Sequence, residues 1–225
     1  MERIKRYAIY YAPRTGALAD AAASWLGWDP CSAVAVPHPD LDADLPGLTA
    51  EPRKYGFHGT IKPPFRLAEG VDATRLRTAV AALARRLRPV RMARLDLISL
   101  EGFLALVPMG DPADLTRLAA DVVKTLDPLR APLTEAEIAR RRPDRLTARQ
   151  YDLLGRFGYP HVMEEFRFHL TLSGNLTPDQ TAILRPLARA HFANHLTEPF
   201  SLTDLCLFGE ALDGRFHLLH RYPLG

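Results

Sequence analysis

One segment of this 225-residue chain occurs twice, and this repeat constrains the fold more than any other feature. Each copy opens with a His-x-Thr triplet, at 58–60 and at 169–171. A helical pattern follows, and then two strand patterns joined at a glycine turn. The two triplets begin 111 residues apart, and the turn glycines Gly102 and Gly214 are 112 residues apart. A repeat that stays in register over this length predicts two structurally equivalent halves.

Hydrophobic periodicity assigns secondary structure to both copies. The first copy is expected to contain a strand at 57–61, a helix at 72–87, and strands at 90–100 and 103–107, with a turn at Pro63-Pro64. The second is expected to contain a strand at 166–172, a helix at 178–194, and strands at 200–208 and 216–222. The remaining chain predicts a strand at 6–12, a helix at 15–26, an irregular loop at 29–52, and helices at 112–129 and 134–157.

This mixture of helices and antiparallel strands predicts an α+β fold. We expect one bilobal domain over 1–225, a pseudo-twofold duplication of a β-α-β-β unit with antiparallel sheets lining a central cleft and helices outside. Repeat one covers about 53–108, a helical insert about 111–158, and repeat two about 164–223.

Strand alternation separates polar from apolar side chains in both motif strands. The polar face comprises His58, Thr60 and Lys62 in the first copy, and Arg167, His169, Thr171 and Ser173 in the second. Such a row is a poor outer surface for a buried sheet but a good lining for an anion-binding groove. Each half is therefore expected to supply an imidazole, a hydroxyl and a cation to one shared cleft.

Cleavage of a phosphodiester needs a base that activates the attacking oxygen and an acid that protonates the leaving oxygen. His58 and His169 suit both roles, because the unperturbed pKa of histidine, about 6.5, lies near neutrality. The hydroxyls of Thr60 and Thr171 are expected to donate to the non-bridging phosphate oxygens. Charge on phosphorus would be offset by Lys62 and Arg167, and Tyr55 is a further candidate for substrate contact at the edge of the site.

Other interpretations of these residues stay open. Hydrogen-bonded core histidines would explain His58 and His169 without catalysis, Lys62 could simply be exposed at a strand end, and Arg167 could pair with Glu164 or Glu165. A third triplet at 195–197 follows directly on a helix and has no counterpart in the repeat, so we interpret it as coincidence. No metal site and no cofactor are expected, because no carboxylate flanks either motif histidine.

The segments Tyr-Gly-Phe-His58-Gly-Thr60-Ile-Lys-Pro-Pro-Phe and Phe-Arg-Phe-His169-Leu-Thr171-Leu-Ser-Gly resemble the two signatures of the two-histidine (2H) phosphoesterase superfamily. The strand at 6–12 and Gly158-Tyr159-Pro160 resemble its bacterial branch associated with phosphonate metabolism. The resemblance implies a bilobal fold in which two histidines are catalytic and two threonines bind phosphate.

We therefore expect a metal-independent 2H-type cyclic phosphodiesterase acting on a small cyclic or linear phosphodiester. A cyclic ribose phosphate is the first choice, and the link to phosphonate metabolism rests on the resemblance alone. The alternatives are an RNA 2′,5′-ligase or cyclic-end RNA phosphodiesterase, and a binding module for phosphorylated ligands without turnover.

Composition adds modest limits to these expectations. The formal net charge of +3 suits an anionic substrate without demanding a nucleic-acid partner, so nucleic acid is the second choice. No apolar run approaches the roughly 20 residues that span a bilayer, and no signal-peptide pattern opens the chain. The two cysteines are expected to be reduced thiols. We expect a cytoplasmic protein without a membrane partner, and the oligomeric state is left open.

Overall fold

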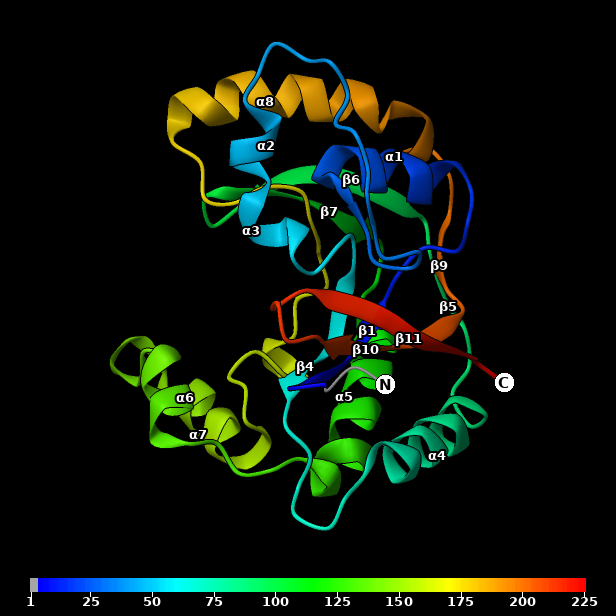
Figure 1. Cartoon of the computed structure of the whole chain (residues 1–225), viewed down its shortest axis with the longest axis vertical. Coiled ribbons are helices and arrows are strands. Elements are labelled where there is room, and N and C mark those ends of the chain that lie inside the picture. Colours follow the sequence, from blue (N-terminus) through cyan, green and yellow to red (C-terminus); the bar gives the residue numbers. More distant parts are fainter. Residues whose placement is uncertain (1–3) are drawn as a thin grey trace.

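The computed structural model describes residues 4–225, and its central element is a seven-stranded antiparallel sheet (Figure 1). Its strands, in the order β11-β10-β1-β4-β8-β7-β6, are β1 (Tyr7–Tyr11), β4 (Gly59–Phe65), β6 (Arg94–Leu100), β7 (Phe103–Met109), β8 (Leu170–Thr171), β10 (Asp204–Glu210) and β11 (Phe216–Pro223). Two short pairs lie beside it, β2 (Trp28–Asp29) with β3 (Val34–Ala35), and β5 (Val90–Met92) with β9 (Phe200–Leu202).

The longer helices are α1 (Ala17–Leu26), α4 (Ala73–Ala84), α5 (Ala113–Leu126), α7 (Ala148–Phe157) and α8 (Pro178–His191), and all of them except α7 cover this sheet. The shorter helices are α2 (Leu45–Leu48), α3 (Ala50–Arg53) and α6 (Glu135–Arg140). Within the described part of the chain, no helix combines the length and the apolar character needed to cross a membrane. The α+β class expected from the sequence is confirmed.

The molecule has two lobes. As drawn in Figure 1, α1, α2, α3, α8, β6 and β7 form the upper lobe, and β1, β10, β11 and the helices α4–α7 form the lower lobe. The central strands β4 and β8 pair at Gly59↔Leu170 alone. Because the sheet is held together there by a single residue pair, it opens on either side of that point.

The two sequence repeats cross between the lobes. The element order β4-α4-β5-β6-β7 recurs as β8-α8-β9-β10-β11. Helix α4 of the first copy packs against β10 and β11 of the second, whereas α8 of the second packs against β6 and β7 of the first. The connecting strands β5 and β9 pair with each other where the chain passes from one lobe to the other (Figure 1). Each lobe therefore contains parts of both copies.

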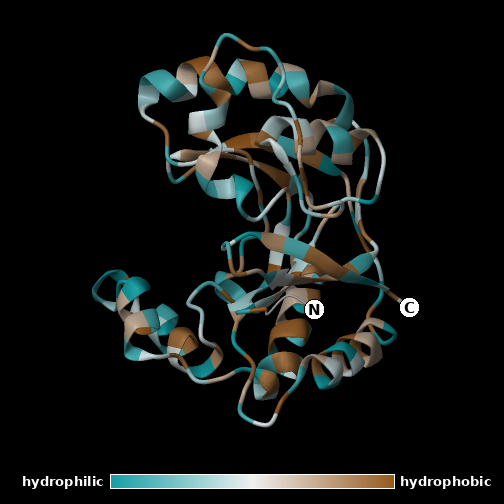
Figure 2. Cartoon of the chain, viewed as in Figure 1, coloured by the Kyte–Doolittle hydropathy of each residue, from teal (hydrophilic) through white to brown (hydrophobic). Residues whose placement is uncertain are grey.

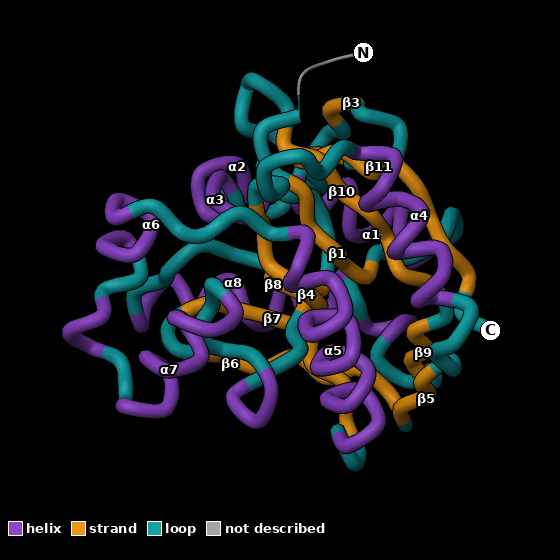
Figure 3. The backbone as a smooth tube through the Cα atoms, turned by 90° about the horizontal axis from the view of Figure 1, so that it is seen from below, coloured by secondary structure: helices purple, strands orange, loops and turns teal. Residues whose placement is uncertain are grey.

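The sheet is buried chiefly by amphipathic helices. In α5, Leu115, Leu118, Val122 and Leu126 recur at helical spacing and are all buried. Figure 2 shows the apolar residues concentrated on the strands and on the helix faces toward them. Figure 3, seen from below, shows α6 and α7 projecting to one side of all the strands. Helices α6 and α7 of the insert thus add a peripheral layer.

Several expected elements differ from the structure. The strands expected at 90–100 and 200–208 each divide in two, β5 with β6 and β9 with β10, and the helical stretch expected at 134–157 divides into α6 and α7. The strand expected at 166–172 shortens to β8, because only Leu170 and Thr171 find strand partners on β4 and β7; burial of Phe166 and Phe168 had produced the alternating pattern. Strand β4 runs through Pro63-Pro64 without turning, which is tolerated because its β8 side is unpaired beyond Gly59. The loop expected at 29–52 contains the two short helices α2 and α3.

Candidate active site

The two motif strands meet at the pair Gly59↔Leu170, and this register positions the site. His58 and Thr60 flank Gly59 along the chain, and His169 and Thr171 flank Leu170, so this one pair brings the four residues together. All four side chains lie on the same face of the sheet, opposite to Leu170. Because the strands run antiparallel, the two histidines lie on opposite sides of this pair; diagonal neighbours of this kind stand roughly 7–8 Å apart in a regular ladder, with their Cβ atoms somewhat closer. That spacing leaves room for one phosphate group between two imidazoles.

Gly59 allows the two strands to approach this closely. A Cβ atom on Gly59 would lie 2.3 Å from Cζ and 2.5 Å from Cε2 of Phe168. The Phe168 ring is buried and also packs against Tyr11 and Phe200, with ring centroids 6.0 and 5.6 Å away. The middle residue of the first His-x-Thr triplet therefore has to be small.

Both histidines are held by the same local hydrogen bond. Nδ1 of His58 lies 2.9 Å from the carbonyl oxygen of Gly56, and Nδ1 of His169 lies 2.8 Å from that of Arg167. A carbonyl only accepts, so Nδ1–H is the donor in each case. In the neutral ring, Nε2 is then an unprotonated acceptor. Two copies of one local structure thus present equivalent nitrogen lone pairs.

Burial lowers the basicity of both imidazoles. It lowers the pKa of His58 to about 4, an effect that the hydrogen bond to Gly56 opposes and that positive charge on His169 reinforces. Burial also lowers the pKa of His169, against the raising effects of its hydrogen bond to Arg167 and of the negative charge on Glu101. Both rings are therefore neutral at pH 7 without ligand, and protonation of His169 disfavours protonation of His58.

A cavity of about 440 Å³ adjoins this face, within the range that holds small-molecule ligands. Its walls include His58, Thr60 and Thr171, as well as Tyr55. His169 lies beside the cavity, with its ring centroid 5.6 Å from that of the lining residue Phe103. Of the predicted site residues, the structure thus brings His58, Thr60, His169, Thr171 and Tyr55 together.

Tyrosines form one wall of the cavity. The Tyr10 ring lies 4.2 Å from the His58 ring and the Tyr55 ring lies 5.5 Å from it, centroid to centroid. The sequence left open which tyrosines of the first strand reach the cleft. Tyr10 does, because it pairs directly opposite Thr60, whereas Tyr11 points into the main core. Tyr10 is 1% exposed, and no hydrogen-bond partner for its hydroxyl occurs among residues 4–225.

The expected position of Lys62 was wrong. Tyr10 pairs with Thr60 but Ile9 pairs with Lys62, so Ile61 is an extra residue in β4. This bulge breaks the alternation and turns Lys62 toward α5. There its Nζ lies 3.3 Å from Oδ1 of Asp127, and burial lowers its pKa to about 8. Lys62 does not line the cavity beside His58.

Arg167 also lies off the cavity, contrary to expectation. The segment before Leu170 is not paired as a strand, so strict alternation does not extend back to Arg167. Its exposed side chain lines a separate hollow together with Phe166 and Glu164. It reaches the site only through its carbonyl group, which accepts from His169. His195 lines another hollow beside Pro199, which agrees with its exclusion from the site.

Several lining residues were not predicted. They are Arg6, Glu51, Phe103, Arg141, Tyr159 and Asn175. Ser173, which strand alternation placed on the polar face of the second motif, also lines the cavity. Arg141 and Tyr159 belong to the insert, and nothing local in the sequence separates Arg141 from its exposed neighbours. Among residues 4–225, no three His, Cys, Asp or Glu side chains are grouped so that they could hold a metal ion.

Taken together, the fold and site define a duplicated α+β protein with paired His-x-Thr motifs at the junction of two lobes. Residues 60–217 match the family described as "Protein of unknown function (DUF1045)", and the chain belongs to that family.

Two curated relatives carry the name "Ribose 1,5-bisphosphate phosphokinase PhnN". The protein from Janthinobacterium sp. (strain Marseille) is 39% identical over 226 residues, covering 95% of this chain and 49% of its own length. The protein from Laribacter hongkongensis (strain HLHK9) is 36% identical over 210 residues, covering 91% of this chain and 48% of its own length. The chain therefore spans about half the length of these relatives.

Among solved structures, E. coli LigT complexed with 3′-AMP is 13% identical, with 99% of each chain covered and a TM-score of 0.48. E. coli LigT complexed with NADP+ is also 13% identical, with 98% of each chain covered and a TM-score of 0.47. At these values the assignment of the site rests on the chain's own residues.

Proposed function

We propose that this chain is a metal-independent phosphodiesterase that opens a small cyclic phosphodiester by two-histidine general acid–base catalysis. The observation that carries the proposal is the symmetric pair His58 and His169. Each ring is anchored through Nδ1, each precedes a threonine by two residues, and both lie around the one pair Gly59↔Leu170. One phosphate between them would meet a base on one side and an acid on the other.

The surroundings of the two histidines favour different roles for them. His58 has a pKa of about 4, so its Nε2 stays unprotonated and suits the general base that activates water. His169 is less buried, and negative charge on Glu101 raises its pKa against the effect of burial. An anionic substrate would raise it further and protonate Nε2, because an opposite charge favours the imidazolium. His169 is then the general acid toward the leaving oxygen.

The two threonines would stabilise charge on the phosphate. Thr60 and Thr171 are half-buried, line the cavity and directly follow the paired residues Gly59 and Leu170. Their hydroxyls can therefore donate to the two non-bridging oxygens while the imidazoles contact the attacking and leaving oxygens. Donors already in place at developing charge need no rearrangement during the reaction.

The curated relatives support a ribose phosphate as substrate. Both are named ribose 1,5-bisphosphate phosphokinase, and the region that matches this chain is about half of each protein. A 1,2-cyclic phosphate of ribose 5-phosphate yields that compound when water attacks phosphorus and the bond from phosphorus to O2 breaks. His58 would take the proton from water, and His169 would give one to O2. The product would then be the substrate of a phosphokinase reaction.

A turnover screen tests this proposal. Purified protein is incubated in EDTA with ribose 1,2-cyclic phosphates, 2′,3′-cyclic nucleotides and 2′,5′-linked oligonucleotides, and His58→Ala is run beside it. We expect hydrolysis of the cyclic ribose phosphates and no hydrolysis by the variant. Turnover of the oligonucleotides alone would establish the RNA alternative, and binding of all compounds without turnover would establish a binding module.

A further inference from the structure

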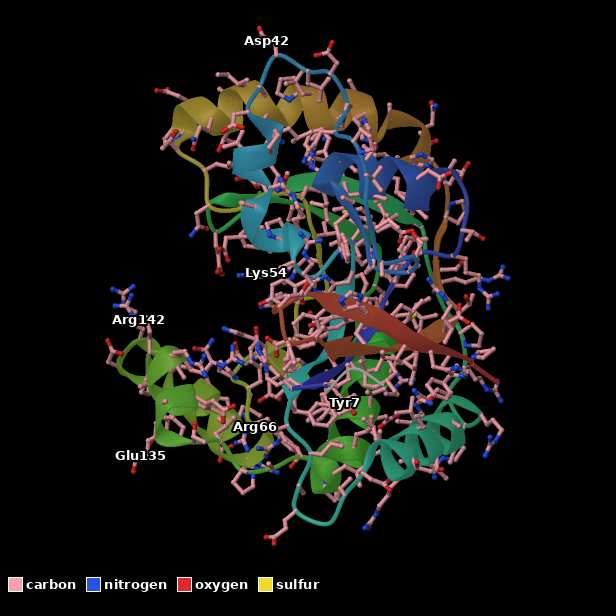
Figure 4. All side chains as sticks on the ribbon, viewed as in Figure 1. Tyr7, Asp42, Lys54, Arg66, Glu135 and Arg142 are labelled. Carbon is pink, nitrogen blue, oxygen red and sulfur yellow. The ribbon has the colours of Figure 1, made fainter. Side chains whose placement is uncertain are left out.

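The insert brings a positive charge into the cavity. Arg141 directly follows α6 and lines the cavity that also contains His58 and Thr171. Figure 4 shows the neighbouring Arg142 on the side of the insert that faces the upper lobe, and Glu135 on the opposite side. The cavity lining therefore includes one arginine from this end of α6.

A capping box and an ion pair with the residue after β4 set the position of α6. Its first turn has a capping box, in which Thr134 and Glu137 bond to each other's backbone N–H groups. Glu137 also accepts two hydrogen bonds from Arg66, 2.9 and 3.2 Å long, and Arg66 directly follows β4. This bond holds the pKa of Glu137 at about 2. The strand that carries Thr60 is thus linked to the helix that presents Arg141.

Arg141 is the cation of this cavity that remains available to a ligand. Its guanidinium lies 4.7 Å from the centre of the Tyr159 ring, and no carboxylate forms a salt bridge with it within residues 4–225. Arg6, the other arginine in the wall, is bonded to Glu210 at 2.5 and 3.1 Å. The acidic lining residue Glu51 is paired with Lys54 at 2.8 Å. A guanidinium stacked on a ring keeps its N–H edge free for an anion.

Two phenol groups complete this part of the cavity. Tyr55 and Tyr159 both line it. Neither hydroxyl has a hydrogen-bond partner in the described chain. Arg141 and these two hydroxyls are donors that the His-x-Thr motifs do not include.

We propose that Arg141, with Tyr55 and Tyr159, forms a second anionic subsite that binds a terminal phosphate monoester of the substrate. The inference deepens the proposed function and rests on it. A terminal phosphate carries a charge of about −1.5 to −2 at pH 7, and its oxygens match the guanidinium fork. The cavity, at about 440 Å³, has room for a sugar with a phosphate at each end. The subsite would select phosphorylated sugars over nucleosides.

The test compares ribose 1,2-cyclic phosphate with and without a 5-phosphate, using wild type, Arg141→Gln and the control Arg140→Gln. Arg140 is exposed and does not line the cavity, so its variant removes the same charge one residue away. Charge-assisted bonds of this kind correspond to roughly a 10- to 100-fold effect. We expect wild type and Arg140→Gln to prefer the 5-phosphorylated compound by that factor, mainly through KM. Arg141→Gln should lose the preference and still hydrolyse the compound without a 5-phosphate.

Equal activity of wild type on both compounds would overturn the inference and leave the phosphodiesterase intact, as would an equal loss on both in Arg141→Gln. If neither compound is hydrolysed, calorimetry with ribose 1,5-bisphosphate and ribose 1-phosphate, which lacks the 5-phosphate, still decides the matter. The subsite predicts that wild type binds the bisphosphate at least tenfold more tightly than the monophosphate, and that Arg141→Gln removes this difference. Equal affinities in wild type would contradict it.

Discussion

Gly59→Ala tests whether one close strand contact positions the site. The added methyl group would lie 2.3 and 2.5 Å from two ring atoms of Phe168, about 1 Å inside ordinary carbon contact. The ring cannot move freely, because Tyr11, Phe166 and Phe200 surround it. Overpacking of this kind costs about 1–3 kcal/mol of unfolding free energy. For a chain of this length, that predicts a fall in Tm of roughly 2–12 °C.

Gly59→Ala should also lower kcat by more than the loss of folded protein explains. Either β4 or β8 must move, and displacing a catalytic group by 1 Å can cost about 100-fold in rate. Thermal melts and kcat for the cyclic ribose phosphate measure the two effects separately. Gly155→Ala is the matched control, because a methyl group there meets nothing within 4 Å. The double variant Gly59→Ala, Phe168→Leu should recover part of both losses. A Gly59→Ala protein with unchanged Tm and full activity would show that the close contact between Gly59 and Phe168 does not position the site.

Three further predictions follow from the site. His58→Ala and His169→Ala should each lower kcat roughly 10²- to 10⁴-fold, with a double variant far from additive, and Thr60→Val or Thr171→Val should lose less; near-wild-type kcat in either histidine variant would contradict the mechanism. The pH profile of kcat/KM should peak between about pH 4 and 6.5, since His58 must be neutral, His169 must be charged, and both pKa values are lowered in the free protein. The alkaline limb of the kcat profile should lie at higher pH, because bound phosphate raises the pKa of His169. An optimum of kcat/KM above pH 7 would be inconsistent with these roles. Lys62→Met should leave KM within about twofold of the wild-type value, since Lys62 lies off the cavity, and a large rise in KM would return Lys62 to the site. In denaturant titrations of wild type, Lys62 should contribute a gain in unfolding free energy as pH rises from about 8 toward 10.5, because its pKa is lower in the folded than in the unfolded chain.

Local patterns in the sequence predicted the repeat and the four residues that the structure brings together around the pair Gly59↔Leu170. His58, Thr60, His169 and Thr171 were recognisable because the chemistry recurs with the elements around it. Their mutual arrangement depends on the pair Gly59↔Leu170, which joins residues 111 positions apart. No local pattern specifies such a pairing.

Lys62 and Arg167 were misplaced for a related reason. Alternation describes a regular strand, and both residues lie where pairing becomes irregular: Lys62 after a bulge opposite Ile9, and Arg167 before β8 begins. Arg141 was missed because the orientation of α6 depends on Glu137 bonding to Arg66, a contact across 71 residues. Pairing and long-range ion pairs are properties of the folded chain, so periodicity alone could not reveal them.

Metal-independent catalysis by two histidines is tested most directly by the product formed from 5-phosphoribosyl 1,2-cyclic phosphate, followed by ³¹P NMR in EDTA. We expect the cyclic diester signal to be replaced by that of ribose 1,5-bisphosphate, and His58→Ala and His169→Ala to leave the diester intact. Activity that EDTA abolishes and added zinc or manganese restores would contradict it, as would the same product formed at an undiminished rate by either histidine variant.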